Sequence, residues 1–243
     1  MHRKIARYSQ LGWSALCAAR YANRRNLIGR SFGTYGRRMG FRAIARGYRT
    51  GIQYVLSPVS AVRYFEFDYV WSMLPQDAID LADMASPRLF AIRVAEERPQ
   101  SRVWMINPDL SDVLATRGYV GALGLKNFTC THTDARMLTE REGAFDCIWS
   151  ISVIEHIAGL YDDTSAIQWL YRALKPGGRL ILTIPVDHTN RDEYRFNDPY
   201  GTQRDQQTDA GKYFFCRWYD AATIQSRLLN PIGRPAIGVR WFG

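Results

Sequence analysis

The chain has 243 residues, of which 47% are hydrophobic, so it is long enough to form one α/β domain with an extension and to bury a sizeable core. It contains no run of about 18 consecutive apolar residues, which excludes a hydropathy-predicted transmembrane helix. Its four cysteines, Cys17, Cys130, Cys147 and Cys216, lack the CxxC or CxxH spacing of a structural zinc site. We therefore expect no metal, no disulfide framework, and reduced thiols in a cytoplasmic protein.

The formal net charge of +9 is concentrated in the first part of the chain. Residues 1–65 contain thirteen Lys and Arg and no acid, whereas residues 66–243 contain nineteen bases and 23 acids. This pattern predicts a basic, partly helical N-terminal arm over residues 1–56, interrupted by glycines and making few core contacts, before a domain over residues 57–243. Three roles stay open for the arm: a solvated extension, a contact with an anionic membrane surface, or a contact with nucleic acid or a transit-like function. The second role would make the protein peripheral to a membrane.

After the arm, residues 57–74 have near-helical spacing, and from residue 78 short apolar strands alternate with helical patterns. Strands are predicted at 78–82, 102–107, 128–134, 145–153 and 179–186, and helices at 86–98, 109–123 and 163–175. This alternation predicts an α/β fold with a Rossmann-like, doubly wound, mostly parallel sheet and helices on both faces. Its ligand crevice should open at the carboxyl ends of the first and fourth strands, where the strand order reverses.

Two segments near the fourth and fifth strands carry a family resemblance: "GAFDCIWSISVIEHI" (143–157) and "LYRALKPGGRLILTIPV" (170–186). They resemble a class I S-adenosylmethionine-dependent methyltransferase of the small-molecule type, over about residues 78–186. The resemblance implies S-adenosylmethionine as the cofactor. It also implies transfer of a methyl group to an oxygen or nitrogen of a small-molecule or glycan-like acceptor.

The family's first motif, acid–x–Gly–x–Gly–x–Gly, is present here without its glycines. Asp80 matches the acid, while Ala82, Met84 and Ser86 stand where glycines would let the backbone approach the ligand. S-adenosylmethionine has no pyrophosphate to cradle, so the resemblance still implies a reshaped site. In it, the helix that begins at Ser86 would meet the methionine carboxylate, and Asp80 or Asp83 would face the ammonium or sulfonium. We expect Met84 to point away from the crevice; the alternative is that it fills the pocket.

The ends of the next three strands supply the other candidate cofactor residues. The resemblance implies that Asn107 bonds the ribose hydroxyls in place of an acid. It also implies that Asp134 accepts a hydrogen bond from the adenine amino group, that Ala135 offers its backbone N–H, and that Ser150 borders the cofactor. Ordinary turns and helix caps are the alternative reading of Asn107 and Asp134.

A proton acceptor is needed if the methyl group goes to a hydroxyl. His156 is the first candidate and His188 the second, with Glu155 beside the first, because these residues follow the fourth and fifth strands. Hydrogen-bonded scaffold is the alternative role for Glu155 and His156. The long segment 187–220 is rich in aromatic residues and predicts a substrate lid, with a disordered polar loop over 190–211 as the alternative.

Two other functions compete with the small-molecule methyltransferase. The missing glycines favour a non-catalytic binding protein of the methyltransferase fold. A nucleic-acid methyltransferase is less favoured, because no Asn/Asp-Pro-Pro-aromatic clamp follows the fourth strand and Cys147 lies within that strand. The oligomeric state is not predicted.

Overall fold

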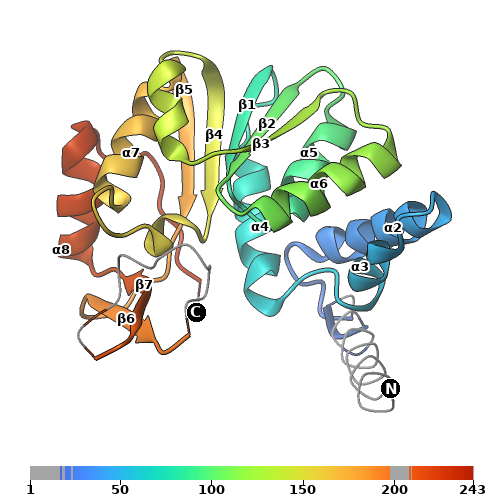
Figure 1. Ribbon diagram of the computed structural model, residues 1–243, viewed down its shortest axis with the longest axis horizontal. Coiled ribbons are helices and arrows are strands. Elements are labelled where there is room, and N and C mark those ends of the chain that lie inside the picture. The colour runs from blue at the N-terminus through green and yellow to red at the C-terminus, as the bar shows by residue number, and fades with distance from the viewer. Residues whose placement is uncertain (1–16, 18–19, 23, 198–207, 209, 243) are drawn as a thin grey trace.

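The computed structural model describes residues 17, 20–22, 24–197, 208 and 210–242 (Figure 1). Its centre is a five-stranded sheet in the order β3-β2-β1-β4-β5, in which every neighbouring pair of strands is parallel. The strands are β1 (Asp80–Met84), β2 (Arg102–Asn107), β3 (Phe128–His132), β4 (Phe145–Ile151) and β5 (Leu174–Thr183). The predicted Rossmann-like sheet, with its reversal between the first and fourth strands, is confirmed.

Helices cover both faces of this sheet and form two cores. The first core packs the sheet against α4 (Ala61–Met73), α5 (Arg88–Glu97) and α6 (Leu110–Leu123). The second packs it against α7 (Asp163–Arg172) and the 3-10 helix η2 (Ala135–Glu140). Side chains alternate between the faces, as a strand requires: Leu81 lies in the first core and Ala82 in the second. None of the described helices is long and apolar enough to cross a membrane.

Part of the predicted N-terminal arm belongs to the first core. Helix α2 (Arg30–Ala45) buries Phe32, Met39 and Ala43, and the Phe32 ring stacks on Phe90 of α5 with centroids 5.6 Å apart. The 3-10 helix η1 (Arg49–Gly51) and α3 (Ile52–Leu56) continue from α2. The expectation that the arm makes few core contacts is therefore wrong for α2. Its apolar residues recur at helical spacing and face the domain. Its arginines make the segment look polar when only its composition is considered.

The strand β1 begins two residues later than predicted. Its last residues include Asp83, which is fully buried. A buried carboxylate inside a strand is not expected from hydropathy, because it needs a hydrogen-bond partner that only the folded turn supplies. The shift matters for the site, because it changes which residues form the turn that follows β1.

The long segment after β5 contains a hairpin instead of a structureless connection. Strands β6 (Arg191–Arg195) and β7 (Tyr213–Trp218) pair antiparallel, and Figure 1 shows them beyond one end of the main sheet. The buried Asp163 anchors the hairpin, because its carboxylate accepts hydrogen bonds from Arg217 (2.7 Å) and from Tyr219 just after β7 (2.8 Å). Half of the predicted polar loop over 190–211 lies outside the described residues, and β6 lies in the described half. After the hairpin, the chain forms the one-turn helix α8 (Ala221–Thr223), the π-helix η5 (Ile224–Leu229) and the 3-10 helix η6 (Asn230–Ile232).

Candidate cofactor and acceptor site

The turn after β1 is held by hydrogen bonds to both neighbouring strands. Ala85 has a left-handed backbone, with φ +51°, and its N–H donates to the Ile106 carbonyl at 2.8 Å. The Asp83 carboxylate accepts the Ser86 N–H at 2.8 Å, and the Ser86 hydroxyl accepts the Ile151 N–H at 2.9 Å. Burial raises the pKa of Asp83 to about 6. The turn is thus fixed without glycine, at the cost of a left-handed alanine.

The acid at this turn stands three residues later in the chain than the one that the sequence suggested. The acid that opens the turn is Asp83, and Ala85 stands at the left-handed position that favours glycine. Ala82 lies inside β1, where it is buried. Ser86 does not cap α5 with its side chain, since its hydroxyl bonds to β4 instead.

Asp80 lies at the opposite end of β1 from the turn. Its carboxylate pairs with Lys175 at 2.8 Å and with Arg102 at the start of β2. The prediction that Asp80 faces the ligand is therefore wrong, because the acid sits at the amino end of a strand whose carboxyl end forms the crevice. Lys175 also bonds Asp146, so these charges join the first residues of β1, β2 and β4.

The ends of β2 and β3 carry Asn107 and Asp134, as predicted. Asn107 is 5% exposed; its Oδ1 accepts the Asp109 N–H and its Nδ2 donates to Asp112, both at 2.8 Å. Asp112 in turn pairs with Arg88, in the first turn of α5. Asp134 caps η2 and binds Arg136, whose guanidinium lowers the pKa of that carboxyl.

The ends of β4 and β5 are joined by a carboxylate from helix α4, which sequence reasoning missed. Glu66, 5% exposed, accepts hydrogen bonds from the Ser152 hydroxyl (2.5 Å) and the Thr183 hydroxyl (2.8 Å). Its second oxygen pairs with Arg63 at 2.5 Å. Ser152 has a left-handed backbone, with φ +49°, so this network holds a strained residue immediately after β4.

Two buried polar groups beside this network lack partners among the described residues. They are the hydroxyl of Ser150, 1% exposed, and Oε2 of Glu155, 3% exposed. Burial, and then the charge of Glu66, raises the pKa of Glu155 to about 8. Glu155 is therefore mainly a neutral hydrogen-bond donor at pH 7.

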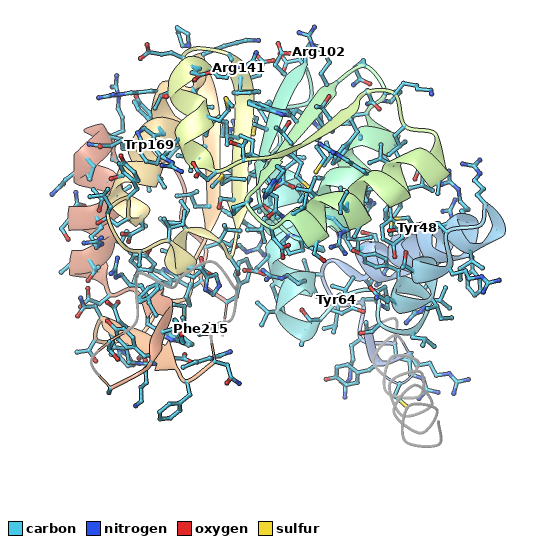
Figure 2. All side chains as sticks on the ribbon, in the orientation of Figure 1. Tyr48, Tyr64, Arg102, Arg141, Trp169 and Phe215 are labelled. Atoms are coloured by element: carbon cyan, nitrogen blue, oxygen red, sulfur yellow. The ribbon has the colours of Figure 1, made fainter. Side chains whose placement is uncertain are left out.

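His156 is oriented by the hairpin. Its Nδ1 lies 2.6 Å from the carbonyl oxygen of Phe215 in β7, and a carbonyl only accepts, so Nδ1 carries the proton and the lone pair is on Nε2. Burial lowers the pKa of His156, which favours the neutral ring at pH 7. Nε2 lies 3.8 Å from Oε1 of Glu155. Figure 2 shows Phe215 on the hairpin side of the sheet.

His188 lies elsewhere, in an exposed stretch after β5. It lines a hollow of about 440 Å³ together with Tyr219, Asp220 and Trp241. The fold therefore separates the two histidine candidates: His156 shares its surroundings with Glu155, while His188 borders a different hollow.

The residues at the carboxyl edge fit S-adenosylmethionine. The unpartnered Ser150 hydroxyl calls for a polar partner that a bound ligand would supply. Asn107 Oδ1 accepts one hydrogen bond and keeps a lone pair for a ribose hydroxyl. The Asp134 carboxylate is engaged by Arg136, whose guanidinium has to move aside before the carboxylate accepts from an adenine amino group. Helix α5 has no side-chain cap, so its first N–H groups suit a carboxylate. Counted from Asp83, the three glycine positions of the family's motif hold Ala85, Pro87 and Leu89.

Residues 90–182, a little over a third of the chain, match the protein family described as "Methyltransferase domain". The chain therefore carries a methyltransferase domain over these residues. The match starts within α5, so the glycine-free turn lies just outside it. The ends of β2, β3 and β4 all lie inside the methyltransferase domain, and the cofactor of that family is S-adenosylmethionine. None of the curated proteins compared with the chain matches it.

Several solved structures resemble the chain at low identity. The cyclase SpnF has 21% identity and a TM-score of 0.47, covering 69% of this chain and 54% of SpnF. Coclaurine N-methyltransferase, bound to N-methylheliamine and S-adenosylhomocysteine, has 17% identity and a TM-score of 0.49, covering 65% and 45%. An O-methyltransferase from a trans-AT PKS multienzyme of Brevibacillus brevis, in complex with S-adenosylhomocysteine, has 14% identity and a TM-score of 0.42, covering 51% and 40%. The matches span about half the length of these proteins, and at such scores none of them indicates the substrate of this chain.

Proposed function

We propose that this chain transfers the methyl group of S-adenosylmethionine to an oxygen or nitrogen of a small-molecule or glycan-like acceptor. The observation that carries the proposal is the position of Asn107, Asp134 and Ser150 at the carboxyl ends of three parallel strands of one sheet, inside a methyltransferase domain. When bound, the cofactor supplies a methyl group on a sulfonium, which leaves as a neutral thioether.

The cofactor side of the site would use five groups of this chain. Asn107 binds the ribose, the Asp134 carboxylate and the Ala135 N–H bind the adenine, and the first turn of α5 binds the methionine carboxylate. Ser150 gains the polar partner that it lacks in the described residues. Asp83 holds the turn and makes no direct contact with the ligand.

The acceptor side would lie at the ends of β4 and β5, between Glu66 and the hairpin. Nε2 of His156 takes the proton of an acceptor hydroxyl, because its lone pair is set by the hydrogen bond of Nδ1 to Phe215. Neutral Glu155 donates a hydrogen bond to the acceptor. An amine acceptor needs only positioning and a route for its proton to solvent. His188 is the alternative base. The hairpin β6–β7 acts as a lid, and the basic N-terminal segment offers an anionic partner a second contact.

The test is transfer of a tritiated methyl group from S-adenosylmethionine to fractionated hydroxyl and amine compounds, including oligosaccharides. Wild-type protein should label an acceptor. His156→Ala should lower the rate about 10²–10⁴-fold for a hydroxyl acceptor, with binding of S-adenosylhomocysteine retained. If His188→Ala shows this loss of rate and His156→Ala does not, the base is His188, which lines the hollow near Trp241.

A second candidate function is a binding protein that holds the cofactor without transferring its methyl group. The left-handed Ala85, whose Cβ occupies space that glycine leaves empty, favours it. Tight binding of S-adenosylmethionine with no label transferred to any hydroxyl or amine fraction would support this function over methyl transfer.

A further inference from the structure

One flank of the molecule is formed by α2 and the segment η1–α3, which cross at two glycines. A Cβ on Gly51 would lie 2.4 Å from the Gly40 carbonyl oxygen, and a Cβ on Gly40 would lie 2.6 Å from the Gly51 carbonyl oxygen. Only glycine permits this contact between backbones. The next residues, Phe41 and Ile52, are both exposed, by 61% and 43%. The crossing therefore brings the backbones of two exposed apolar residues close together.

Exposed arginines belong to the same two segments as this apolar pair. Arg38 of α2 and Arg49 of η1 are exposed, and α2 carries no acidic residue. All of the first 65 residues lack acids, whereas the rest of the chain has a slight excess of them. The net positive charge is thus carried by the first 65 residues, and six of their thirteen basic residues lie in the segment 30–56 that forms this flank.

We propose that Arg38, Phe41, Arg49 and Ile52, which we name the α2–α3 face, dock on an anionic lipid bilayer. Basic side chains near the surface of such a bilayer are attracted to its headgroups, and aromatic and aliphatic side chains enter the boundary between headgroups and acyl chains. The two kinds of side chain occur here together, on a rigid crossing of helices.

The apolar part of the face favours a bilayer over a nucleic acid. Phosphate binding uses arginine but gains nothing from an exposed aliphatic side chain, whereas Ile52 loses its water contact on entering a lipid interface. The proposal goes beyond methyl transfer and stands independently of it. Figure 1 shows α2 and α3 on the flank of α5 and α6, away from the hairpin β6–β7, so docking leaves the hairpin side of the site uncovered.

The experiment is sedimentation of the full chain with phosphatidylcholine vesicles, with and without phosphatidylserine. We expect binding to the phosphatidylserine vesicles, falling steeply as salt is raised. The double variant Arg38→Ala/Arg49→Ala should weaken partitioning about 30-fold, at about fivefold per arginine. Phe41→Ser should weaken it about tenfold, because its ring no longer enters the interface.

The control is Arg102→Ala/Arg141→Ala, which removes the same charge from two arginines that Figure 2 places at the far end of the sheet. It should change partitioning less than about twofold. Circular dichroism checks that each variant is folded. Equal binding to vesicles without phosphatidylserine, or an equal loss in the control, would overturn the proposal. So would tighter binding to a DNA or RNA duplex that the same face variants abolish, since the face would then serve nucleic acid.

Discussion

Replacing Glu155 by glutamine should stabilise the protein increasingly as the pH rises from 5 to 9. Glu155 is 3% exposed, Oε2 lacks a partner among the described residues, and burial with the charge of Glu66 raises its pKa from 4.5 to about 8. In the unfolded chain the carboxyl ionises near pH 4.5. Between these two values the folded state holds the proton and the unfolded state does not, so wild-type stability falls as the pH rises through this window.

The size of this effect follows from the two pKa values. The contribution of Glu155 is fully present below pH 4.5 and is lost by the time the pH has passed 8. From pH 5 to pH 9 the loss amounts to about 4 kcal/mol, at about 1.4 kcal/mol per pH unit up to the folded pKa. Glutamine has the same shape and does not ionise, so it removes this dependence. The free energy of unfolding of Glu155→Gln minus that of wild type should grow by that amount.

The assay is urea unfolding at pH 5, 7 and 9, followed by the fluorescence of tryptophan. Glu142→Gln is the matched control, because Glu142 is an exposed glutamate just before β4. It should track the wild type at every pH. Parallel stability curves for wild type and Glu155→Gln would refute the reasoning, since Glu155 would then ionise equally easily in the folded and unfolded states.

Three further variants test other parts of the structure. Glu66→Gln should cost about 1–3 kcal/mol of stability in urea, because the Ser152 and Thr183 hydroxyls lose a charged acceptor. It should also lower the pKa of Glu155 and so flatten the pH dependence described above. If neither the stability nor the pH dependence changes, the network is contradicted. Phe32→Ala should cost about 3–5 kcal/mol in the same assay, whereas a loosely attached α2 predicts almost none. Met84→Gly should change the affinity for S-adenosylhomocysteine less than about tenfold in calorimetry, because Met84 packs in the second core; stronger tightening would mean that it plugs the pocket.

Local patterns predicted most of the sheet. The span of β2 agrees with its prediction, 102–107, because an apolar run ends there at a polar turn. The parallel order followed from alternating strands and helices together with right-handed crossovers. Asn107 and Asp134 could be placed at strand ends for the same reason.

Long-range contacts and the first turn could not be predicted in the same way. Glu66 meets Ser152 and Thr183 across 86 and 117 residues, and nothing in its local sequence distinguishes it from an exposed helical glutamate. The sequence placed the turn after Asp80 instead of Asp83 because both residues fit the acid of the family's motif. Only their hydrogen-bond partners in the folded structure distinguish them. Asp80 pairs with Lys175, whereas Asp83 accepts the Ser86 N–H. The apolar face of α2 was likewise not predicted, because the arginines of this helix make its composition polar.

The most direct test of the central claim is calorimetry of S-adenosylhomocysteine with the wild type and Asp134→Ala. We predict one site per chain in the wild type and an affinity weaker by about 1–3 kcal/mol in the variant, because the adenine amino group loses its acceptor. Glu140→Ala, an exposed carboxylate at the end of η2, is the control and should bind as the wild type does. If wild-type protein gives no binding heat and no thermal shift at about millimolar ligand, the account is contradicted, because the carboxyl edge of the sheet is then not a cofactor site.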